Sequence, residues 1–598
     1  MTNISDGVCA IKEEYIVKRT TNIDTESSSN SIKRKLDDTG DCKDNNGDNK
    51  LSKNNNTDNI WTKHKKRGQN KARPKTFHDN KEDKPCPSIV DVKCSDEVKP
   101  CQYTNCKFIH NPSDYLTTKP KDISQKCHIF DIRGKCPRGI ACRFGSEHIT
   151  PEGYNLVNEE KFMKWKEDTQ NTLQHTLQIQ LQKRTYDLSF AEKLVKLMDT
   201  RNKSLEKTSS DLENTTTENT VDKEKKFSGT ITDEDIIKLL PREKKTINWE
   251  NKLYLSPLTT VGNLPFRRIC KQYGADITCG EMALCESLLK GTKQEWALVK
   301  RHESEDIFGA QICGNNAYII TKVAQLLQEN AHLDFIDLNL GCPIDLIYKK
   351  GGGSGMMHRL PTLQASITCA SKLLNIPFTI KMRTGVYQNK KIAHTIIPKV
   401  VEAGVSMVCL HGRSREARYT RSADWEYIET CAKAAAPCPV FGNGDILNYE
   451  DYVQRREMAP SIQGVMIGRG ALIKPWVFTE IKEQRLWDIS SKERFEIIKK
   501  YTNYGLEHWG SDVQGVENTR RFLLEWLSFL YRYVPVGLLE RPPQKINERP
   551  PTYFGRDDLE TLMGSANCVD WIKISEMLLG PVPDGFKFLP KHKTNLYQ

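Results

Sequence analysis

Two groups of cysteine and histidine residues in the amino-terminal third of the chain have the composition of structural zinc sites. Each group offers three thiolates and one imidazole, which fill the tetrahedral shell that zinc prefers. Few apolar residues surround them, so bound metal would supply much of the folding free energy. The spacings are C-x6-C-x4-C-x3-H and C-x8-C-x5-C-x5-H, and the predicted ligands are Cys94, Cys101, Cys106 and His110, then Cys127, Cys136, Cys142 and His148.

Two histidines compete for the fourth position of the second group. His148 has a longer spacing than the histidine of the first group, but His128 adjoins Cys127 and is too close to it to be a convenient ligand. A basic residue and a phenylalanine follow the third cysteine of each group, at Lys107–Phe108 and Arg143–Phe144. A cation beside an aromatic ring suits a phosphate contact and a base stack, so this region also indicates nucleic-acid binding.

A third set of polar residues follows short apolar runs between residues 250 and 485. Glycines such as Gly444 and Gly468 let backbone N–H groups approach a phosphate, and Arg469 adds a cation. A lysine such as Lys381 near the pyrimidine edge of a flavin stabilises its anionic reduced form, so the set suggests FMN. The residues concerned are Pro257, Leu258, Thr259, Gln311, Asn339, Cys342, Lys381, Arg383, His411, Asn443, Gly444, Asp445, Gly468 and Arg469.

The elements that must position these residues are eight strands alternating with amphipathic helices, which is the arithmetic of a (β/α)8 TIM barrel. Active sites of that fold lie at the carboxyl ends of the strands, where the polar residues occur. A doubly wound sheet is the alternative, but its first strand usually precedes a GxGxxG loop that this chain lacks there. The expected strands are 253–259, 275–282, 308–314, 335–342, 377–385, 407–413, 439–445 and 464–470.

The remaining segments frame the barrel. Residues 41–60 contain seven asparagines and residues 63–75 contain seven basic residues and no acid, so we expect a disordered basic and polar tail over 1–85. The expected order of domains is that tail, tandem zinc fingers at 86–150, a helical segment and linker at 151–240, the barrel at 250–485 and a helical domain at 486–598. In the helical domain, Ser490 and Glu493 predict a capping box.

Composition narrows the class of protein. Of 598 residues, 37% are hydrophobic, and the net charge of +12 fits a polyanionic partner. The first residues lack the apolar core of a secretory signal, and no apolar run reaches the length of a membrane span. We therefore expect reduced cysteines, no membrane association, and a place in the cytoplasm, the nucleus or both.

Several motifs together resemble the tRNA-dihydrouridine synthases in order and spacing. They are PLTTVGNLPFR, QICG, DLNLGCP, KMRTG, HGRSREARYTRSADW, FGNGDI and MIGRGAL, of which DLNLGCP is the most specific. The two cysteine and histidine groups are similar to CCCH zinc fingers, which often bind single-stranded RNA. Fingers ahead of such a barrel are similar to the eukaryotic branch of the family that modifies the variable-loop uridine at position 47.

The resemblance implies an enzyme that reduces uridine to 5,6-dihydrouridine in tRNA, with mRNA as a further candidate substrate. NADPH or NADH would reduce FMN, and Cys342 would be the catalytic acid. The residues that would hold the flavin are Pro257, Leu258, Thr259, Gln311, Lys381, His411, Asn443, Gly444, Asp445, Gly468 and Arg469. Asn339, Arg383, Arg415 and Tyr419 would face the substrate, and basic residues such as Arg520 and Arg521 of the helical domain would grip the RNA. We expect a monomer.

The same residues allow two other functions. An FMN enzyme acting on a small pyrimidine would explain Lys381 and the phosphate site but has no use for zinc fingers. An RNA-binding adaptor with an inactive barrel would explain the fingers but does not need Cys342, Lys381 and His411 together at strand ends.

Overall fold

The computed structural model describes residues 7–17, 81–198, 200, 244–417 and 419–591. Most of the predicted tail, including the basic run at 63–75, and the predicted linker at 205–226 lie outside these residues. No helix within the described residues is long and apolar enough to cross a membrane.

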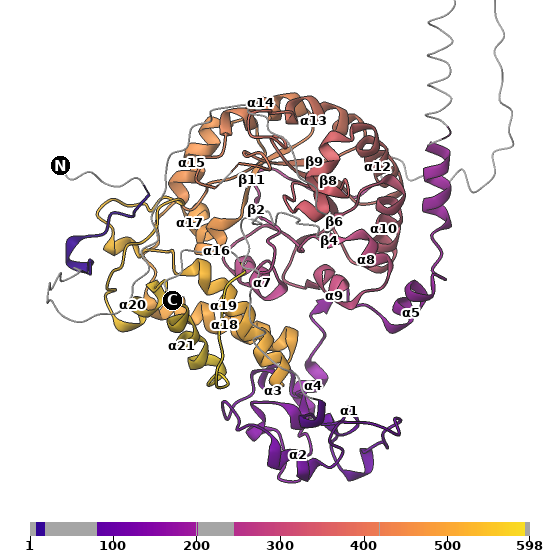
Figure 1. Ribbon diagram of the computed structural model, residues 1–598, viewed down its shortest axis with the longest axis vertical. Helices are drawn as coiled ribbons and strands as arrows, with labels where there is room; N and C mark the ends of the chain where they lie inside the picture. Colours follow the sequence, from indigo (N-terminus) through magenta and orange to yellow (C-terminus); the bar gives the residue numbers. More distant parts are fainter. Residues whose placement is uncertain (1–6, 18–80, 199, 201–243, 418, 592–598) are drawn as a thin grey trace, which may run out of the picture.

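A closed parallel barrel forms the centre of the molecule, with helices around it (Figure 1). Each barrel strand pairs with the next one along the chain, and the last strand pairs with the first. All eight predicted strands are therefore confirmed. Their bounds are β2 (Leu253–Leu255), β3 (Ile277–Cys279), β6 (Ile307–Cys313), β7 (Phe335–Leu340), β8 (Phe378–Arg383), β9 (Met407–His411), β10 (Val440–Asn443) and β11 (Gly464–Ile467).

Short polar caps fix where several of the surrounding helices begin. Asn263, Asn316, Asp424 and Asn448 each accept a hydrogen bond from a backbone N–H in the first turn of the helix that follows. The helices of the barrel layer are α7 (Leu264–Gln272), α8 (Cys285–Leu289), α9 (Lys293–Trp296), α10 (Ala317–Asn330), α12 (Leu360–Leu373), α13 (Ala393–Glu402), α14 (Trp425–Ala435), α15 (Tyr449–Met458), α16 (Arg469–Ile473) and α17 (Val477–Glu483).

The alternation of side chains along each strand divides the barrel into two apolar layers and one polar layer. In β7, Ile336, Leu338 and Leu340 pack outward against the helices. The opposite face of the same strand places Phe335 in an interior cluster with Trp249, Tyr254, Met407, Cys409, Phe441 and Met466. Because successive side chains point to opposite faces, Asp337 and Asn339 follow Phe335 into the interior, closer to the carboxyl end.

A helical domain follows the barrel, built around the antiparallel pair α18 (Ser491–Trp509) and α19 (Val513–Leu530) with α20 (Asp558–Gly564) and α21 (Cys568–Leu579). The capping box of Ser490 and Glu493 is confirmed at the start of α18. Trp526 of α19 joins this domain to the barrel, because its indole donates to the Leu472 carbonyl at 3.0 Å and its ring packs 5.5 Å from Phe266.

The segment between the fingers and the barrel, expected to be helical at the start of 151–240, is not one continuous helix. It consists of α4 (Glu159–Lys164), the two-residue strand β1 (Thr169–Gln170) and α5 (His175–Lys183), with a further helical stretch at 189–198. β1 pairs antiparallel with β5 (Arg301–His302), at the amino-terminal side of the barrel. Leu177 and Leu181, one turn apart on α5, are both buried.

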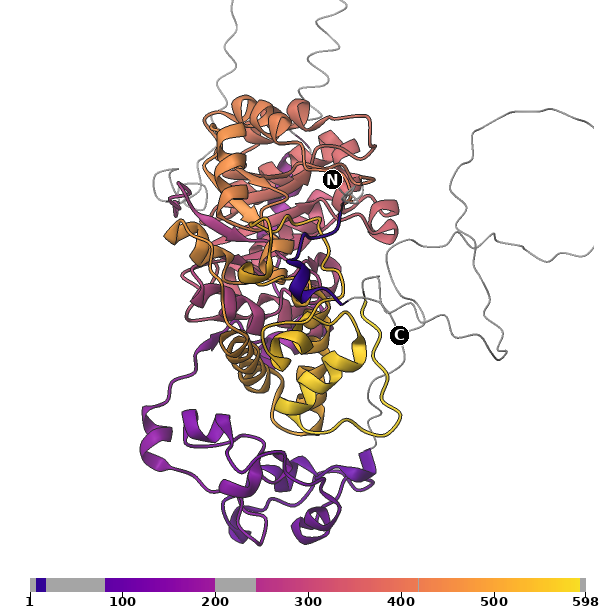
Figure 2. The same ribbon diagram turned by 90° about the vertical axis from the view of Figure 1, so that its left-hand side faces the viewer.

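Residues 7–17 depart from the disordered tail expected over 1–85. Cys9 and Ile11 are buried against the helical domain, and isolated bridges join Val8 to Arg549 and Ile16 to Tyr553. The turn η1 (Glu13–Tyr15) lies beside the chain between α19 and α20 (Figure 2), where the Phe554 N–H donates to the Tyr15 carbonyl at 2.8 Å. A composition averaged over a long window hides so short an apolar segment, whose order depends on a surface more than 500 residues away in sequence.

Candidate functional site

The carboxyl ends of the barrel strands bring the predicted polar residues to one mouth. In the register of the sheet, Asn339 lies opposite Lys381, and Arg383 lies opposite His411. Asn443 is held in the same layer by a hydrogen bond from its amide to the Met466 carbonyl at 2.7 Å. Pro257 and Leu258 are half-buried and Thr259 is exposed at the end of β2, so they line the rim of the mouth.

A chain of hydrogen bonds crosses three strands and ends at Cys342. Thr379 donates to Asp337 at 2.7 Å, and the Gln311 amide donates to the other oxygen of that carboxyl at 2.7 Å. The Asn339 amide donates to the Gln311 carbonyl oxygen at 2.8 Å and accepts from the backbone N–H of Cys342 at 2.8 Å. Gln311 and Asn339 therefore act here by fixing the loop that carries the thiol.

Sequence reasoning missed Asp337, the acceptor at the far end of this series of hydrogen bonds. Its carboxyl is completely enclosed, and burial raises its pKa to about 6 although Gln311, Thr379 and Lys381 act in the opposite direction. The signal that could have found it is the polar pair Asp337 and Asn339 at alternate positions of an otherwise apolar strand.

Cys342 lies in a tight, mostly closed position at the end of β7. Its side chain is 8% exposed, and its carbonyl accepts a hydrogen bond from Ser354 at 2.8 Å. The next turn approaches so closely that a Cβ on Gly353 would lie 3.0 Å from the Cβ of Cys342, and the φ of Gly353 is +54°. Burial raises the pKa of the thiol, while the backbone N–H of Ile344 and the charges of Arg383 and Arg415 act in the opposite direction. The group is therefore a protonated thiol at neutral pH.

A cationic cluster lies at the ends of β9, β10 and β11. Asp445 accepts hydrogen bonds from Arg413 at 2.6 Å and from Arg469 at 2.7 Å. Two guanidinium groups against one carboxylate leave a net positive charge, and the ring of Tyr419 lies 4.3 Å from the Arg469 guanidinium. Burial and the surrounding cations lower the pKa of His411 far below its ordinary value, so its imidazole is neutral. Arg413 is a second residue that sequence reasoning did not assign.

The cluster fits a phosphate-bearing group. Gly444 has a φ of +133°, and a Cβ there would meet Ala423 at 2.6 Å, so the backbone at this point needs glycine. Gly468 also has no side chain to cover its N–H group beside Arg469. The carboxylate of Asp445 is engaged with the two arginines and with the backbone N–H of Ala423, so its role here is to orient the cations.

The predicted substrate residues lie around the same mouth. Arg383 donates to the carbonyls of Gly341 and Ser414, both at 2.9 Å, which spans the loops after β7 and β9. Arg415 pairs with Asp345 and lies over the ring of Tyr348 at 4.1 Å. Tyr419 is about half exposed and stacks on His411 at 6.3 Å.

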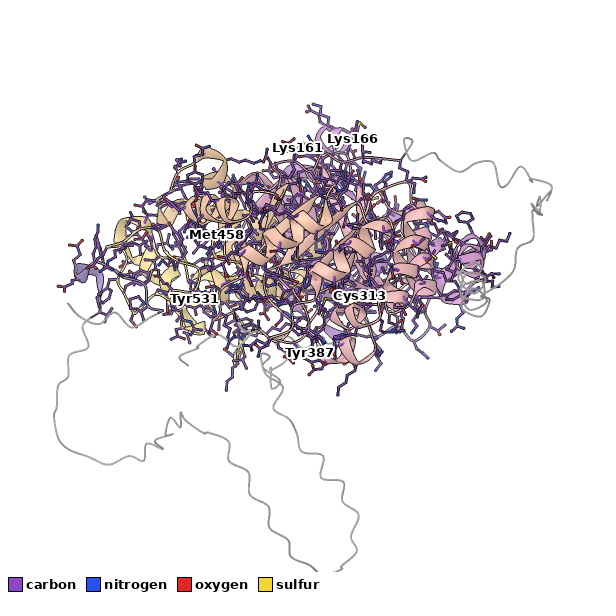
Figure 3. The ribbon with its side chains drawn as sticks, turned by 90° about the horizontal axis from the view of Figure 1, so that it is seen from above. Lys161, Lys166, Cys313, Tyr387, Met458 and Tyr531 are labelled. Carbon is purple, nitrogen blue, oxygen red and sulfur yellow. The ribbon has the colours of Figure 1, made fainter. Side chains whose placement is uncertain are left out.

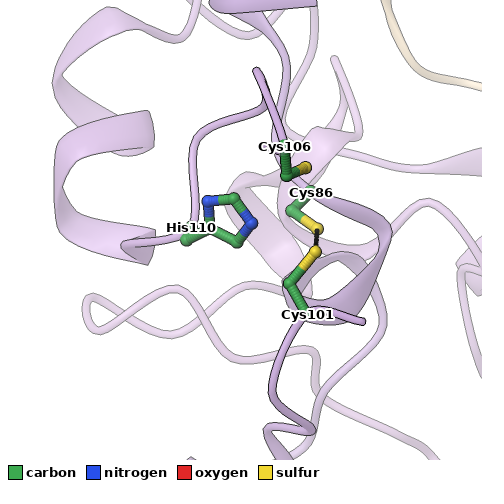
Figure 4. Close-up of side chains that lie close together, drawn as sticks. All are labelled: Cys86, Cys101, Cys106 and His110. Atoms are coloured by element: carbon green, nitrogen blue, oxygen red, sulfur yellow. Dashed lines mark hydrogen bonds between the residues drawn. The ribbon is translucent and has the colours of Figure 1, made fainter. Parts of the chain in front are cut away.

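The first metal group needs one correction, because its fourth ligand is Cys86 and not Cys94. The ligand atoms of Cys86, Cys101, Cys106 and His110 lie within 4.8 Å of one another (Figure 4). The Cys86 N–H donates to the carbonyl of Ile109 at 2.7 Å, which fixes this cysteine beside His110. Cys94 is exposed and caps the short turn η3 (Ser95–Glu97). Nothing in the sequence indicated this choice, because the backbone pairing with Ile109 that brings Cys86 to the group joins residues 23 positions apart.

The second metal group has the predicted members, Cys127, Cys136, Cys142 and His148. His148 is completely buried, its Nδ1 is paired with Asn155 at 3.1 Å, and its Nε2 has no hydrogen-bond partner. A buried imidazole nitrogen without a partner, aimed at three thiols, fits a zinc ligand fixed by a second hydrogen bond. His128, the competing histidine, instead pairs with Glu507 at 2.8 Å.

The second finger is joined closely to the helical domain. Glu507 of α18 links His128 to Arg268 of the barrel layer, which lies 2.6 Å from the same carboxylate. The Arg143 N–H donates to the Ser511 carbonyl at 2.8 Å, and the Ser511 hydroxyl lies 3.4 Å from the Cys136 sulfur. Figure 1 shows α3 (His128–Arg133) beneath the carboxyl end of α18. The second finger therefore packs on the helical domain and is not a separate module.

One predicted RNA contact is excluded. Arg520 is 1% exposed and donates to Ser575 at 3.1 Å and to the carbonyls of Leu579 and Gly580 at 2.8 and 2.9 Å. It holds α19 against the end of α21 and is closed to RNA. The helical pattern of the sequence did not show that this arginine lies on the buried face.

The mouth of this parallel barrel combines a protonated thiol, a set of hydrogen-bonded polar side chains and a cationic cluster. Such a mouth is typical of a (β/α)8 barrel enzyme, and its charge suits an anionic ligand. The dihydrouridine synthase (Dus) family model matches residues 254–527. The chain is 53% identical over 547 residues to tRNA-dihydrouridine(47) synthase [NAD(P)(+)]-like of Xenopus tropicalis, covering 90% of this chain and 85% of the other. The protein of the same name from Homo sapiens is 50% identical over 563 residues, covering 90% and 85%. That of Arabidopsis thaliana is 41% identical over 589 residues, covering 86% and 85%. The chain belongs to the dihydrouridine synthase family.

Proposed function

We propose that this protein is an NAD(P)H-dependent enzyme that reduces uridine in tRNA to 5,6-dihydrouridine. Its family and the names of its relatives support the reaction class and the tRNA substrate. The observation that carries the proposal in the structure is the protonated Cys342 thiol, fixed by Asn339 at the mouth of the barrel.

FMN is the cofactor that the mouth fits. Arg469 and the backbone of Gly444 and Gly468 would bind its phosphate, and Lys381 and Gln311 would face its ring. Arg413, which is buried, would add positive charge behind Asp445. When bound, FMN supplies the hydride that C6 of the uracil receives. The neutral His411 would offer a nitrogen to the cofactor without adding a further positive charge to the cluster.

Cys342 supplies the proton for C5. Because burial raises the pKa of its thiol, the group carries its proton throughout the neutral range and can release it to a carbon that is gaining negative charge. The thiolate left behind lies near Arg383 and Arg415, which stabilise it until solvent returns the proton. One hydride and one proton together saturate the C5–C6 bond.

The fingers and the rest of the basic surface would hold the RNA outside the mouth. A uridine within folded RNA must be extruded before its C5 can reach a buried thiol. Zinc at the two clusters would fold the fingers that position that RNA. We propose the variable-loop uridine at position 47 as the target because relatives carry that number in their names, with mRNA as a second substrate.

Incubation of the purified protein with NADPH, FMN and unmodified tRNA tests the proposal. We expect a yellow protein and dihydrouridine at one site, found by mass spectrometry of nuclease fragments. Free uridine serves as the comparison substrate, and Cys342→Ala as the comparison enzyme. A colourless protein that does not take up FMN, or tRNA left unmodified by a flavin-loaded protein, would overturn the assignment.

A further inference from the structure

Two loops beside Cys342 carry aromatic side chains that the reaction itself does not use. Tyr387, in the loop after β8, is 49% exposed, and its ring lies 5.7 Å from the ring of His358. Tyr348, on α11 (Asp345–Lys349), interacts with the Tyr387 hydroxyl; burial and this contact raise the pKa of Tyr348. We call Tyr348, Tyr387 and His358 the aromatic rim. Figure 3 shows Tyr387 projecting from one edge of the molecule.

The aromatic rim is held in register with the catalytic thiol. Tyr348 and His358 belong to the segment that follows Cys342 and folds back onto it, through the hydrogen bond from Ser354 to the Cys342 carbonyl and the close approach of Gly353. The loop of Tyr387 is tied to the loop after β9 by the Arg415 N–H, which donates to the Gly385 carbonyl at 2.9 Å. Both loops that carry the aromatic rim are therefore tied to strand ends that form the mouth.

The chemistry of the aromatic rim suits nucleobases. The Arg415 guanidinium stacks on Tyr348 at 4.1 Å and is fixed there by Asp345, which gives a flat cationic and aromatic face. Exposed Lys349, Lys350 and Lys390 surround it and can meet phosphates. Aromatic rings with nearby cations are the means by which proteins bind unstacked RNA bases.

Extrusion of the target uridine creates the need for such a face. The flipped base leaves its neighbours without a stacking partner, and the enzyme must offset that loss. We infer that the aromatic rim stacks on the nucleobases adjoining the target uridine while that uridine occupies the mouth. The inference rests on the proposed function, since it takes RNA as the substrate.

A second surface with basic and aromatic side chains lies too far from Cys342 to bind the nucleotides next to the target uridine. Lys161, Lys166 and Trp165 line a cavity of about 490 Å³ between the second finger and the barrel. That cavity includes Glu303, which follows β5 at the amino-terminal side of the barrel. In Figure 3, Lys161 and Lys166 lie at the upper edge of the molecule and Tyr387 at the lower edge. Bases next to a uridine at Cys342 reach the aromatic rim and not this cavity.

The test uses the full-length protein and a tRNA transcript with 2-aminopurine beside the target uridine. Stacking on an aromatic side chain changes the fluorescence of this base, so binding by the wild type should give a large change. Tyr387→Leu should abolish most of that change and weaken RNA affinity about 10-fold, the order expected for one lost base stack. Tyr387→Phe keeps the ring and should behave as the wild type. Tyr318→Leu, a 42% exposed tyrosine of α10, is the matched control.

The outcomes separate the aromatic rim from the proposed function. If Tyr387→Leu binds RNA as tightly as the wild type with the same fluorescence change, the inference is overturned even when the wild type makes dihydrouridine. If the wild type makes no dihydrouridine but the fluorescence change depends on the ring at position 387, the proposed reaction fails and the base-stacking surface stands. The thermal midpoint and flavin content of each variant report folding, and should Tyr387→Leu not fold, His358→Leu and Tyr348→Leu give the same readout.

Discussion

Asp337 offers a sharp test of the electrostatics inside the barrel. Its carboxyl accepts hydrogen bonds from Thr379 and Gln311 in a completely buried position. Asp337→Asn keeps the size of the side chain. The new carbonyl oxygen can accept from Gln311, and the new amide can donate to the Thr379 hydroxyl, which rotates to accept. The hydrogen-bond chain to Cys342 is thus preserved while the titrating group is removed.

The expected magnitude follows from the raised pKa. The carboxyl titrates at about 6 in the folded protein against 3.8 when unfolded. The folded state binds this proton more tightly, so the contribution to stability is complete below the unfolded pKa and is lost as the pH rises through the folded pKa. Two pKa units correspond to about 3 kcal/mol, and about half of that change falls between pH 5 and pH 8. Asp337→Asn should therefore be more stable than the wild type at pH 8, and the advantage should shrink towards pH 5.

The assay is thermal unfolding of both proteins at several pH values in this range. At pH 8 the stability difference between Asp337→Asn and the wild type should be ~3 kcal/mol, which corresponds to ~5 °C in the midpoint of a domain of this size. Asp306→Asn is the matched control, because the Asp306 side chain is 78% exposed and its replacement should change the midpoint little. If the midpoint difference between Asp337→Asn and the wild type is constant from pH 5 to pH 8, the buried carboxyl does not titrate as described and the reasoning fails.

Three further changes test the site and the fingers. Cys342→Ala should slow dihydrouridine formation in single turnovers by ~10²–10⁴-fold, the usual contribution of a positioned acid, whereas Cys313→Ala, a nearby buried thiol, should not; equal rates for Cys342→Ala and the wild type would remove Cys342 as the donor. Arg469→Ala removes a cation from the cluster and should lower the ratio of flavin to protein after gel filtration; an unchanged ratio would place the phosphate elsewhere. Cys136→Ser should release one of two zinc ions, measured by mass spectrometry. It should also lower the thermal midpoint of the barrel and helical domain, because Cys136 contacts Ser511 next to α18. Cys94→Ser should release no zinc, and zinc loss from this variant would restore Cys94 as a ligand.

The barrel and its mouth could be predicted because both depend on local pattern. Strand residues that alternate with amphipathic helices define the eight strands, and the carboxyl end of each strand is where a barrel places its site. Cys342 and Lys381 were found in this way, since Cys342 follows one recognisable strand and Lys381 lies near the carboxyl end of another. The capping box at Ser490 is likewise a property of adjacent residues.

Features that join distant segments could not be predicted. Cys86 reaches the first metal group through a backbone pairing with Ile109. The pKa of Asp337 is raised only because the fold encloses its carboxyl, where Thr379 and Gln311 donate to it. The sequence pattern is compatible with an exposed Arg520, but in the folded protein this arginine is buried against the end of α21. Burial and hydrogen-bond partners decide each of these roles, and neither is visible in the spacing of residues along the chain.

The sequence by itself determined the (β/α)8 barrel, the thiol at the end of its fourth strand, the resemblance to tRNA-dihydrouridine synthases and one complete set of metal-binding residues. Periodicity and adjacency carry that information, because each strand or motif forms from neighbouring residues. The tertiary structure alone decided the ligand set of the first finger, the docking of the second finger on Glu507 and Ser511, and the ordered segment at residues 7–17. These depend on contacts between segments tens to hundreds of residues apart, whose free energy appears only when the chain has folded and water has been excluded from between them.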